Sequence, residues 1–135
     1  MREGWCDDDY LILFDESEIS AVSDRYAISQ FLPGHQILGL AGWDDFIVQN
    51  SSGQTYRLPT VPMDQRHLSP FPLVTIDKDA LQPDARFSGK IKWYVQPLVF
   101  GGDPKAKDNI VWVTHDEHAQ LVKWWNNKYR ELRNS

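Results

Sequence analysis

Two histidines in the second half of the chain are the residues best suited to bind a metal. His115 and His118 are three positions apart, and the acids Asp116 and Glu117 lie between them. Residues at i and i+3 of a helix share one face, so the two rings can approach one ion. The spacing differs from the H-E-x-x-H pattern of zinc hydrolases, and histidines that only form hydrogen bonds at a helix start are more common. A small metal-dependent hydrolase that uses His115 and His118 is therefore an alternative hypothesis.

The other candidates for chemistry are Cys6 and the adjacent acids Asp44 and Asp45. Cys6 precedes three aspartates, whose negative charge disfavours the thiolate that a nucleophile requires. Asp44 and Asp45 could act as general acid and base, but neighbours in an extended segment point to opposite faces unless a turn intervenes. The sequence contains no phosphate-binding loop, dinucleotide-binding loop or serine-hydrolase elbow. We therefore expect neither enzymatic activity nor a cofactor.

The distribution of charge indicates a protein that binds another protein. The chain has 135 residues and a net charge of −5. Residues 1–50 carry ten acids and two bases, a net charge of −8, whereas residues 51–135 carry nine acids and twelve bases, a net charge of +3. An acidic surface attracts a basic protein, and the lack of a basic surplus argues against nucleic acid as a partner. A solvated acidic face that keeps the protein soluble is the alternative.

An aromatic residue accompanies one of the acidic segments. Trp43 lies in a Gly-Trp-Asp-Asp segment between two expected strands. Aromatic side chains flanked by charges are common at interfaces, because they bury a large area with little loss of rotamer freedom. Packing of this tryptophan on its own core is at least as common. The predicted partner-binding residues are Asp7, Asp8, Asp9, Trp43, Asp44 and Asp45.

Two helices are predicted from capping sequences and hydrophobic spacing. Asp15 and Glu18 form a cap sequence before a short helix over residues 16–26. Thr114 and Glu117 form the same cap sequence before a longer C-terminal helix. The stripe that this second helix presents to a sheet is expected to be Val122, Trp125, Tyr129 and Leu132.

The strands are expected to form a central, mostly antiparallel sheet of about five or six strands. The turn sequence Asn50–Gly53 predicts a β-hairpin, and four prolines between residues 59 and 72 exclude a continuous helix or central strand there. The strand candidates are residues 10–14 (alternatively a helix start), 37–40, 46–48, 55–58, 73–76, 90–95 and 109–113. Because strands and helices do not alternate, the pattern favours one α+β domain over residues 1–135, with both helices packed on the sheet.

The sequence predicts no contact with a membrane. No apolar run approaches the ~18 residues of a membrane span, and the first residues lack the pattern of a secretory signal. A single cysteine excludes an internal disulfide, as is usual in a reducing compartment. We therefore expect a cytoplasmic protein.

Two stretches of the chain carry a recognisable pattern of segments. The first stretch comprises Tyr26–Gly34, Ile37–Gly39, Phe46–Asn50, Gly53–Pro59 and Val61–Asp64. The second comprises Pro97–Pro104, Asn109–Thr114 and Glu117–Asn126. Together they resemble the SUKH superfamily of bacterial immunity proteins. Members of the superfamily usually carry a run of glycines before the second strand, where this chain has Gly42-Trp43-Asp44-Asp45.

The resemblance implies a SUKH-like α+β fold, no catalysis and a role as an immunity protein. Such proteins bind a cognate polymorphic toxin, often delivered by contact-dependent or type VI secretion, and block it in the cytosol. Many of these toxins are nucleases or other enzymes with basic faces, which suits the acidic first half of this chain. The expected mechanism is stoichiometric occlusion of the toxin's active or substrate-binding face. A scaffold or interaction protein of the same fold without a toxin partner is a further alternative.

Overall fold

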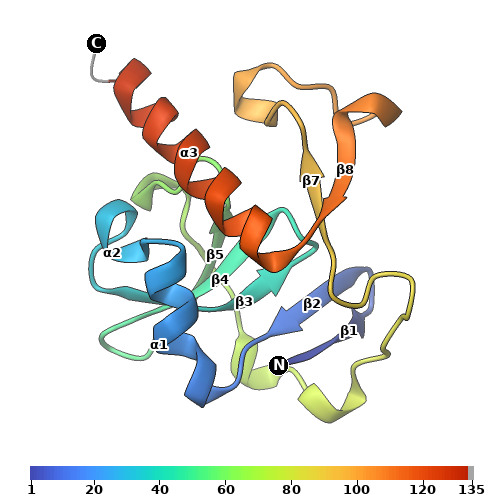
Figure 1. The fold of residues 1–135 in the computed structure, drawn as a ribbon. Coiled ribbons are helices and arrows are strands. Elements are labelled where there is room, and N and C mark those ends of the chain that lie inside the picture. The colour runs from blue at the N-terminus through green and yellow to red at the C-terminus, as the bar shows by residue number, and fades with distance from the viewer. Residues whose placement is uncertain (134–135) are drawn as a thin grey trace.

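The computed structural model describes residues 1–133 and shows an α+β protein with two sheets. The larger sheet is an antiparallel meander in which each strand pairs with its neighbours in sequence (Figure 1). Its strands are β1 (Arg2–Cys6), β2 (Asp9–Leu13), β3 (His35–Ala41), β4 (Asp45–Asn50), β5 (Thr55–Pro59) and β6 (Ser69–Pro70). The smaller antiparallel sheet is a hairpin of β7 (Ile91–Tyr94) and β8 (Ile110–Val113). The predicted fold class and the β4–β5 hairpin are confirmed.

The α-helices pack on one face of the larger sheet. They are α1 (Glu16–Arg25), α2 (Ile28–Phe31) and α3 (His115–Arg133). The first two connect β2 to β3, while α3 follows directly from β8 and crosses the sheet as the longest helix in Figure 1. Short 3₁₀ turns occur at Gln65–His67, Leu73–Thr75, Lys78–Ala80, Leu98–Phe100 and Lys107–Asn109.

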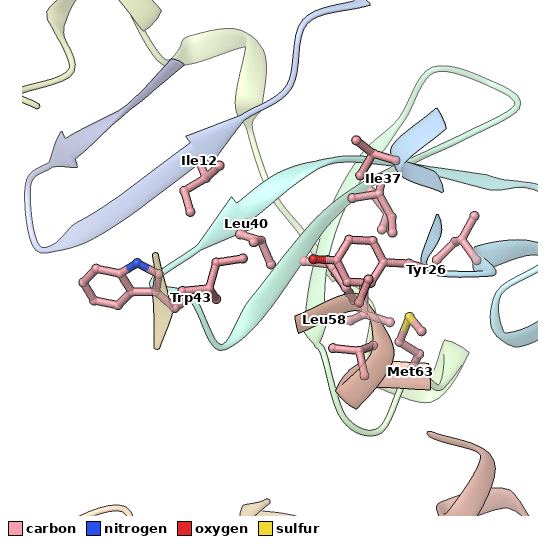
Figure 2. Packing of buried hydrophobic residues seen from close by; sticks show 14 of the residues in the cluster. Ile12, Tyr26, Ile37, Leu40, Trp43, Leu58 and Met63 are labelled. Atoms are coloured by element: carbon pink, nitrogen blue, oxygen red, sulfur yellow. The ribbon is translucent and has the colours of Figure 1, made fainter. Parts of the chain in front are cut away.

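Apolar side chains cover both faces of the large sheet. Alternate strand residues, including Ile12, Leu40 and Leu58, point toward the helices and meet Tyr26 and Met63 there (Figure 2). The opposite face carries the intervening residues Leu11, Leu13, Ala41 and Ile47, and the segment over residues 71–82 covers them with Leu73 and Leu81. The sheet is therefore the middle of three layers, with the helices on one side and an irregular segment on the other.

The strand predicted at residues 73–76 is wrong, since a 3₁₀ turn over Leu73–Thr75 occupies this place. Pro72 starts the turn and accepts a hydrogen bond from the Thr75 backbone N–H at 3.0 Å. Leu73 is buried against the sheet, whereas the next residue, Val74, is 94% exposed. The β-branched residues of this segment suggested a strand, but only Leu73 is buried and Ile76 partly buried, and no strand among the described residues pairs with the segment.

The edge strand β1 was not predicted, because its sequence does not alternate between apolar and polar residues. The segment after the 3₁₀ turns passes directly across this strand. Trp5 N–H donates to Gln82 O at 2.9 Å, and Gln82 N–H donates back to Trp5 O at 3.1 Å. A Cβ atom at Gly4 would lie only 2.7 Å from the Gln82 carbonyl carbon, so a glycine is required at this crossing.

Helix α3 begins as predicted but buries a different stripe. Glu117 N–H donates to Thr114 Oγ1 at 3.2 Å, and Thr114 N–H donates to Glu117 Oε1 at 3.0 Å, which completes the capping box. The buried residues of the helix are His118, Ala119, Val122 and Asn126. Of the four residues expected in the stripe, Val122 is buried, Trp125 and Tyr129 are half-buried and Leu132 is exposed.

Asn126 explains why the buried stripe includes polar residues. Its side chain is 2% exposed, and it connects α3 to the chain that leaves β5. Asn126 Oδ1 accepts from Met63 N–H at 2.7 Å, while Nδ2 donates to Thr60 O at 2.8 Å and to Val122 O at 2.9 Å. All the polar atoms of the side chain are therefore satisfied inside the protein, as burial requires.

Replacement of Asn126 tests this connection. In Asn126→Ala the Met63 N–H and the Thr60 carbonyl remain buried without partners, so the free energy of unfolding is expected to fall by about 3 kcal/mol. Asn127→Ala is the matched control, because Asn127 is exposed in the same helical turn and should change stability by less than about 0.5 kcal/mol. Urea denaturation of both variants measures the difference, and equal stabilities would contradict the assignment.

Candidate functional site

The sequence-predicted binding residues lie together at one end of the large sheet. In an antiparallel meander alternate turns lie at the same end, so the β1–β2 turn is a neighbour of the β3–β4 turn. The pairing of Leu11 with Ala41 places Asp9 beside the β3–β4 turn. We name this surface the acidic end, and it consists of Asp7, Asp8, Asp9, Trp43, Asp44 and Asp45.

Two bases from the second half of the chain partly neutralise the acidic end. Arg57 on β5 donates from Nε to Asp45 Oδ2 at 2.5 Å and from Nη1 to Asp9 Oδ2 at 3.0 Å. Burial opposes the charge of Arg57, but its hydrogen bonds to these two carboxylates outweigh that effect and raise the pKa of the guanidinium. The ion pairs tie β2, β4 and β5 together at the turns.

A second base, Lys92 on β7, joins the hairpin to the β3–β4 turn. Its Nζ donates to Asp44 Oδ2 at 3.0 Å and to the Tyr94 hydroxyl at 3.2 Å. Burial raises the pKa of the Asp44 carboxyl, although attraction to Lys92 acts in the opposite direction. Burial also opposes the charge of Lys92, but attraction and hydrogen bonding to Asp44 raise the pKa of the ammonium above its ordinary value.

The negative charge that remains is concentrated at the β1–β2 turn. Asp7 and Asp8 are exposed, and neither forms an ion pair within residues 1–133. The five carboxylates of the acidic end face two bases, which leaves an excess of three negative charges in this set. Of the negative charge in the first half of the sequence, the acidic end therefore carries a part, and bases of the second half compensate some of that part.

Trp43 packs on its own core. The side chain is only 9% exposed, and its ring stacks on Tyr10 with the centroids 5.1 Å apart. Phe87 and Trp112 contact it edge-on, each at 5.1 Å. The backbone of Trp43 is left-handed, with φ of 62°, which is unfavourable for a residue other than glycine. The aromatic contacts with Tyr10, Phe87 and Trp112 hold the ring against the protein in this conformation.

A pocket of about 240 Å³ lies beside the acidic end, between the large sheet and the hairpin. The residues that line it come from the β3–β4 turn, the end of β5, and β7 with the loop that follows. They are Trp43, Asp44, Asp45, Pro59, Thr60, Val61, Trp93, Tyr94, Pro97 and Leu98. Asp44 belongs to the turn and Asp45 begins β4, so the turn brings both carboxylates to one pocket.

The sequence prediction did not include the residues of the hairpin. Several of its apolar side chains are exposed, among them Leu98, Val111 and Trp112 at 46%, 39% and 41%. Trp112 is also part of the aromatic cluster, since its ring stacks on Phe87 at 5.1 Å. The sequence signal that could have indicated these residues is the high density of apolar side chains in β7 and β8, which are too short to bury all of them. The hairpin extends the acidic end with an apolar surface.

His115 and His118 lie in different surroundings and contact different residues. His118 is completely buried, and its Nδ1 lies 2.6 Å from the Tyr26 hydroxyl, whereas the half-buried His115 ring is 6.4 Å from the ring of Phe14. Of the possible oxygen ligands, Asp116 pairs with Arg25 at 3.3 Å and Glu117 caps α3. Within residues 1–133, no group of three or more His, Cys, Asp or Glu side chains is placed to hold a metal ion.

No family model, curated protein or solved structure matches the chain. In the described part of the chain, the helices are all too short or too polar to cross a lipid bilayer.

His118 makes the stability of the protein dependent on pH. Burial lowers the pKa of His118 to about 3, from an ordinary value of 6.5. Below pH 6.5 the unfolded chain binds a proton that the folded protein excludes, so stability is lost as the pH falls toward 3. Between pH 7.5 and 5.0 this effect amounts to about 2 kcal/mol.

Replacement of the histidine by a neutral amide should remove that loss. His118→Gln is expected to reduce the difference between the free energies of unfolding at pH 7.5 and 5.0 by about 2 kcal/mol. His67→Gln, at an exposed position, is the control and should leave the difference unchanged. Urea denaturation at the two pH values measures both, and an unaltered difference in His118→Gln would contradict the burial of a neutral imidazole.

Proposed function

We propose that this chain is a cytoplasmic immunity protein that binds a secreted bacterial toxin and covers its active or substrate-binding face. The observation that carries the proposal is the juxtaposition of an uncompensated acidic β1–β2 turn and a mainly apolar pocket at one end of the sheet. The resemblance to the SUKH superfamily supports the same function, as it predicts a binding protein without catalysis.

The exposed acids favour rapid association with a basic partner. Asp7 and Asp8 lie at the tip of a hairpin turn, where solvent-exposed charge acts at long range. Charges of this kind mainly increase the rate of encounter and exclude partners of like charge. Toxins that act on nucleic acids require basic surfaces for their substrate. An acidic protein that docks on such a surface competes directly with the substrate.

The apolar side chains next to the acids favour slow dissociation. Leu98 and Trp112 are partly exposed beside the pocket and the aromatic cluster, and aromatic residues at the centre of an interface contribute much of the binding energy. The turns need little rearrangement, because Arg57 and Lys92 already hold them in place. A preorganised surface loses less conformational entropy on binding.

Co-expression with the toxin-domain protein encoded by the adjacent gene tests the proposal. We expect a complex of defined stoichiometry in size-exclusion chromatography and restored growth of cells that make the toxin. The absence of both a complex and protection would overturn the proposal. A chain of the same fold with a non-toxin scaffold role would be encoded away from toxin genes.

Charge reversal at the β1–β2 turn tests the role of the acidic end. Asp7→Lys with Asp8→Lys is expected to lower the association rate for the toxin about tenfold or more at low salt, with a smaller effect at high salt. Asp24→Lys with Glu131→Lys changes the net charge equally at exposed positions of α1 and α3 and should have little effect. Surface plasmon resonance measures both rates, and equal slowing by the two double variants would remove this surface from the interface.

A further inference from the structure

We propose that the pocket beside the acidic end receives the side chain of an arginine of the partner protein. This inference deepens the proposed function, since it names the group that anchors the toxin. The pocket has about 240 Å³, which is below the ~300–1,000 Å³ typical of sites for drug-sized ligands. A cavity of this size suits one protein side chain.

The lining of the pocket has the composition that such a side chain requires. Its walls are aromatic or aliphatic, and the two charged residues among its lining, Asp44 and Asp45, are both acids. The bases that pair with these acids, Arg57 and Lys92, are not part of the lining. An amphipathic cation can therefore place its apolar stem against the walls and its charge at the carboxylates.

The carboxylates retain acceptor capacity toward a ligand. Within the described residues, the hydrogen bonds that Asp44 accepts from Lys92 and Tyr94 all go to Oδ2. The hydrogen bond that Asp45 accepts from Arg57 likewise goes to Oδ2. The Oδ1 atom of each carboxylate accepts none of these hydrogen bonds, so it retains acceptor capacity for a guanidinium group, which carries five N–H donors.

The protein's own lysine shows that a cation is stable in this environment. Lys92 Nζ lies 4.8 Å from the centre of the Tyr94 ring and 5.9 Å from that of Trp43, in addition to its ion pair with Asp44. Aromatic faces attract cations at these distances. Arginine suits the remaining space better than a second lysine, because its planar group stacks on aromatic rings and is more weakly hydrated.

The test is a titration of the whole protein with N-acetyl-arginine amide, followed by NMR of the indole N–H groups. Trp43 and Trp93 line the pocket, and their Nε1 atoms are buried without hydrogen-bond partners, so their resonances report on it. Variants Trp43→Phe and Trp93→Phe assign the two signals. We expect saturable shifts of both signals with the arginine compound and none with N-acetyl-citrulline amide, its uncharged analogue.

Pocket variants test the contacts one at a time. Asp45→Asn is expected to weaken arginine binding about tenfold, since the amide can still accept a hydrogen bond but no longer carries the negative charge that strengthens it. Leu98→Ala removes a wall residue that is half exposed, so the fold should persist while binding weakens. Val74→Ala, at an exposed apolar residue outside this pocket, is the control and should bind as the unaltered protein does.

The outcomes separate this inference from the proposed function. Absence of saturable shifts, or equal shifts with citrulline, would overturn the arginine pocket even if a toxin complex forms. Saturable arginine binding that Asp45→Asn and Leu98→Ala weaken would support it. If arginine binds but the adjacent toxin-domain protein does not, the pocket stands and the proposed immunity function falls.

Discussion

The buried amide of Asn126 is the contact on which the arrangement of the candidate site depends. It joins α3 to the Thr60 and Met63 backbone, and Thr60 is part of the pocket wall. Because α3 follows directly from β8, the position of the helix also sets the position of the hairpin against the large sheet. Asn126 thus holds the Thr60 side of the pocket directly, through hydrogen bonds in the protein interior, and the hairpin side through the helix that it anchors.

The ion pairs show how a charge imbalance along the sequence is compensated in three dimensions. Arg57 and Lys92 belong to the basic second half, yet they lie against acids of the first half because the meander and the hairpin bring these segments together. Within the acidic end, and among the residues described, Asp7 and Asp8 at the tip of the β1–β2 turn are the carboxylates that form no ion pair. The total charge of a segment therefore overestimates the charge of the surface that it forms, since partners distant in sequence remove part of it.

The sequence was informative where structure depends on neighbouring residues. The caps at Glu18 and Glu117 form as predicted, because each requires only residues three positions apart. The stripe of α3 was wrong in part, as hydrophobic spacing cannot identify buried polar residues such as Asn126, whose partners are distant in sequence. For the same reason no local pattern indicated that the strand at 73–76 would lack a neighbour to pair with.

The site combines a part that was predictable with a part that was not. The acids of the turns could be selected from the sequence, because their type and clustering indicate a surface. Trp43 was selected with them, but its ring is buried in the aromatic cluster and lines the pocket. Under the proposed function, recognition would require both halves of the chain, since the first supplies the charge and the hairpin in the second supplies most of the apolar wall. A partner that matched only the charge would associate rapidly and dissociate rapidly, so in the proposed complex the apolar pocket is the part that would make occlusion durable.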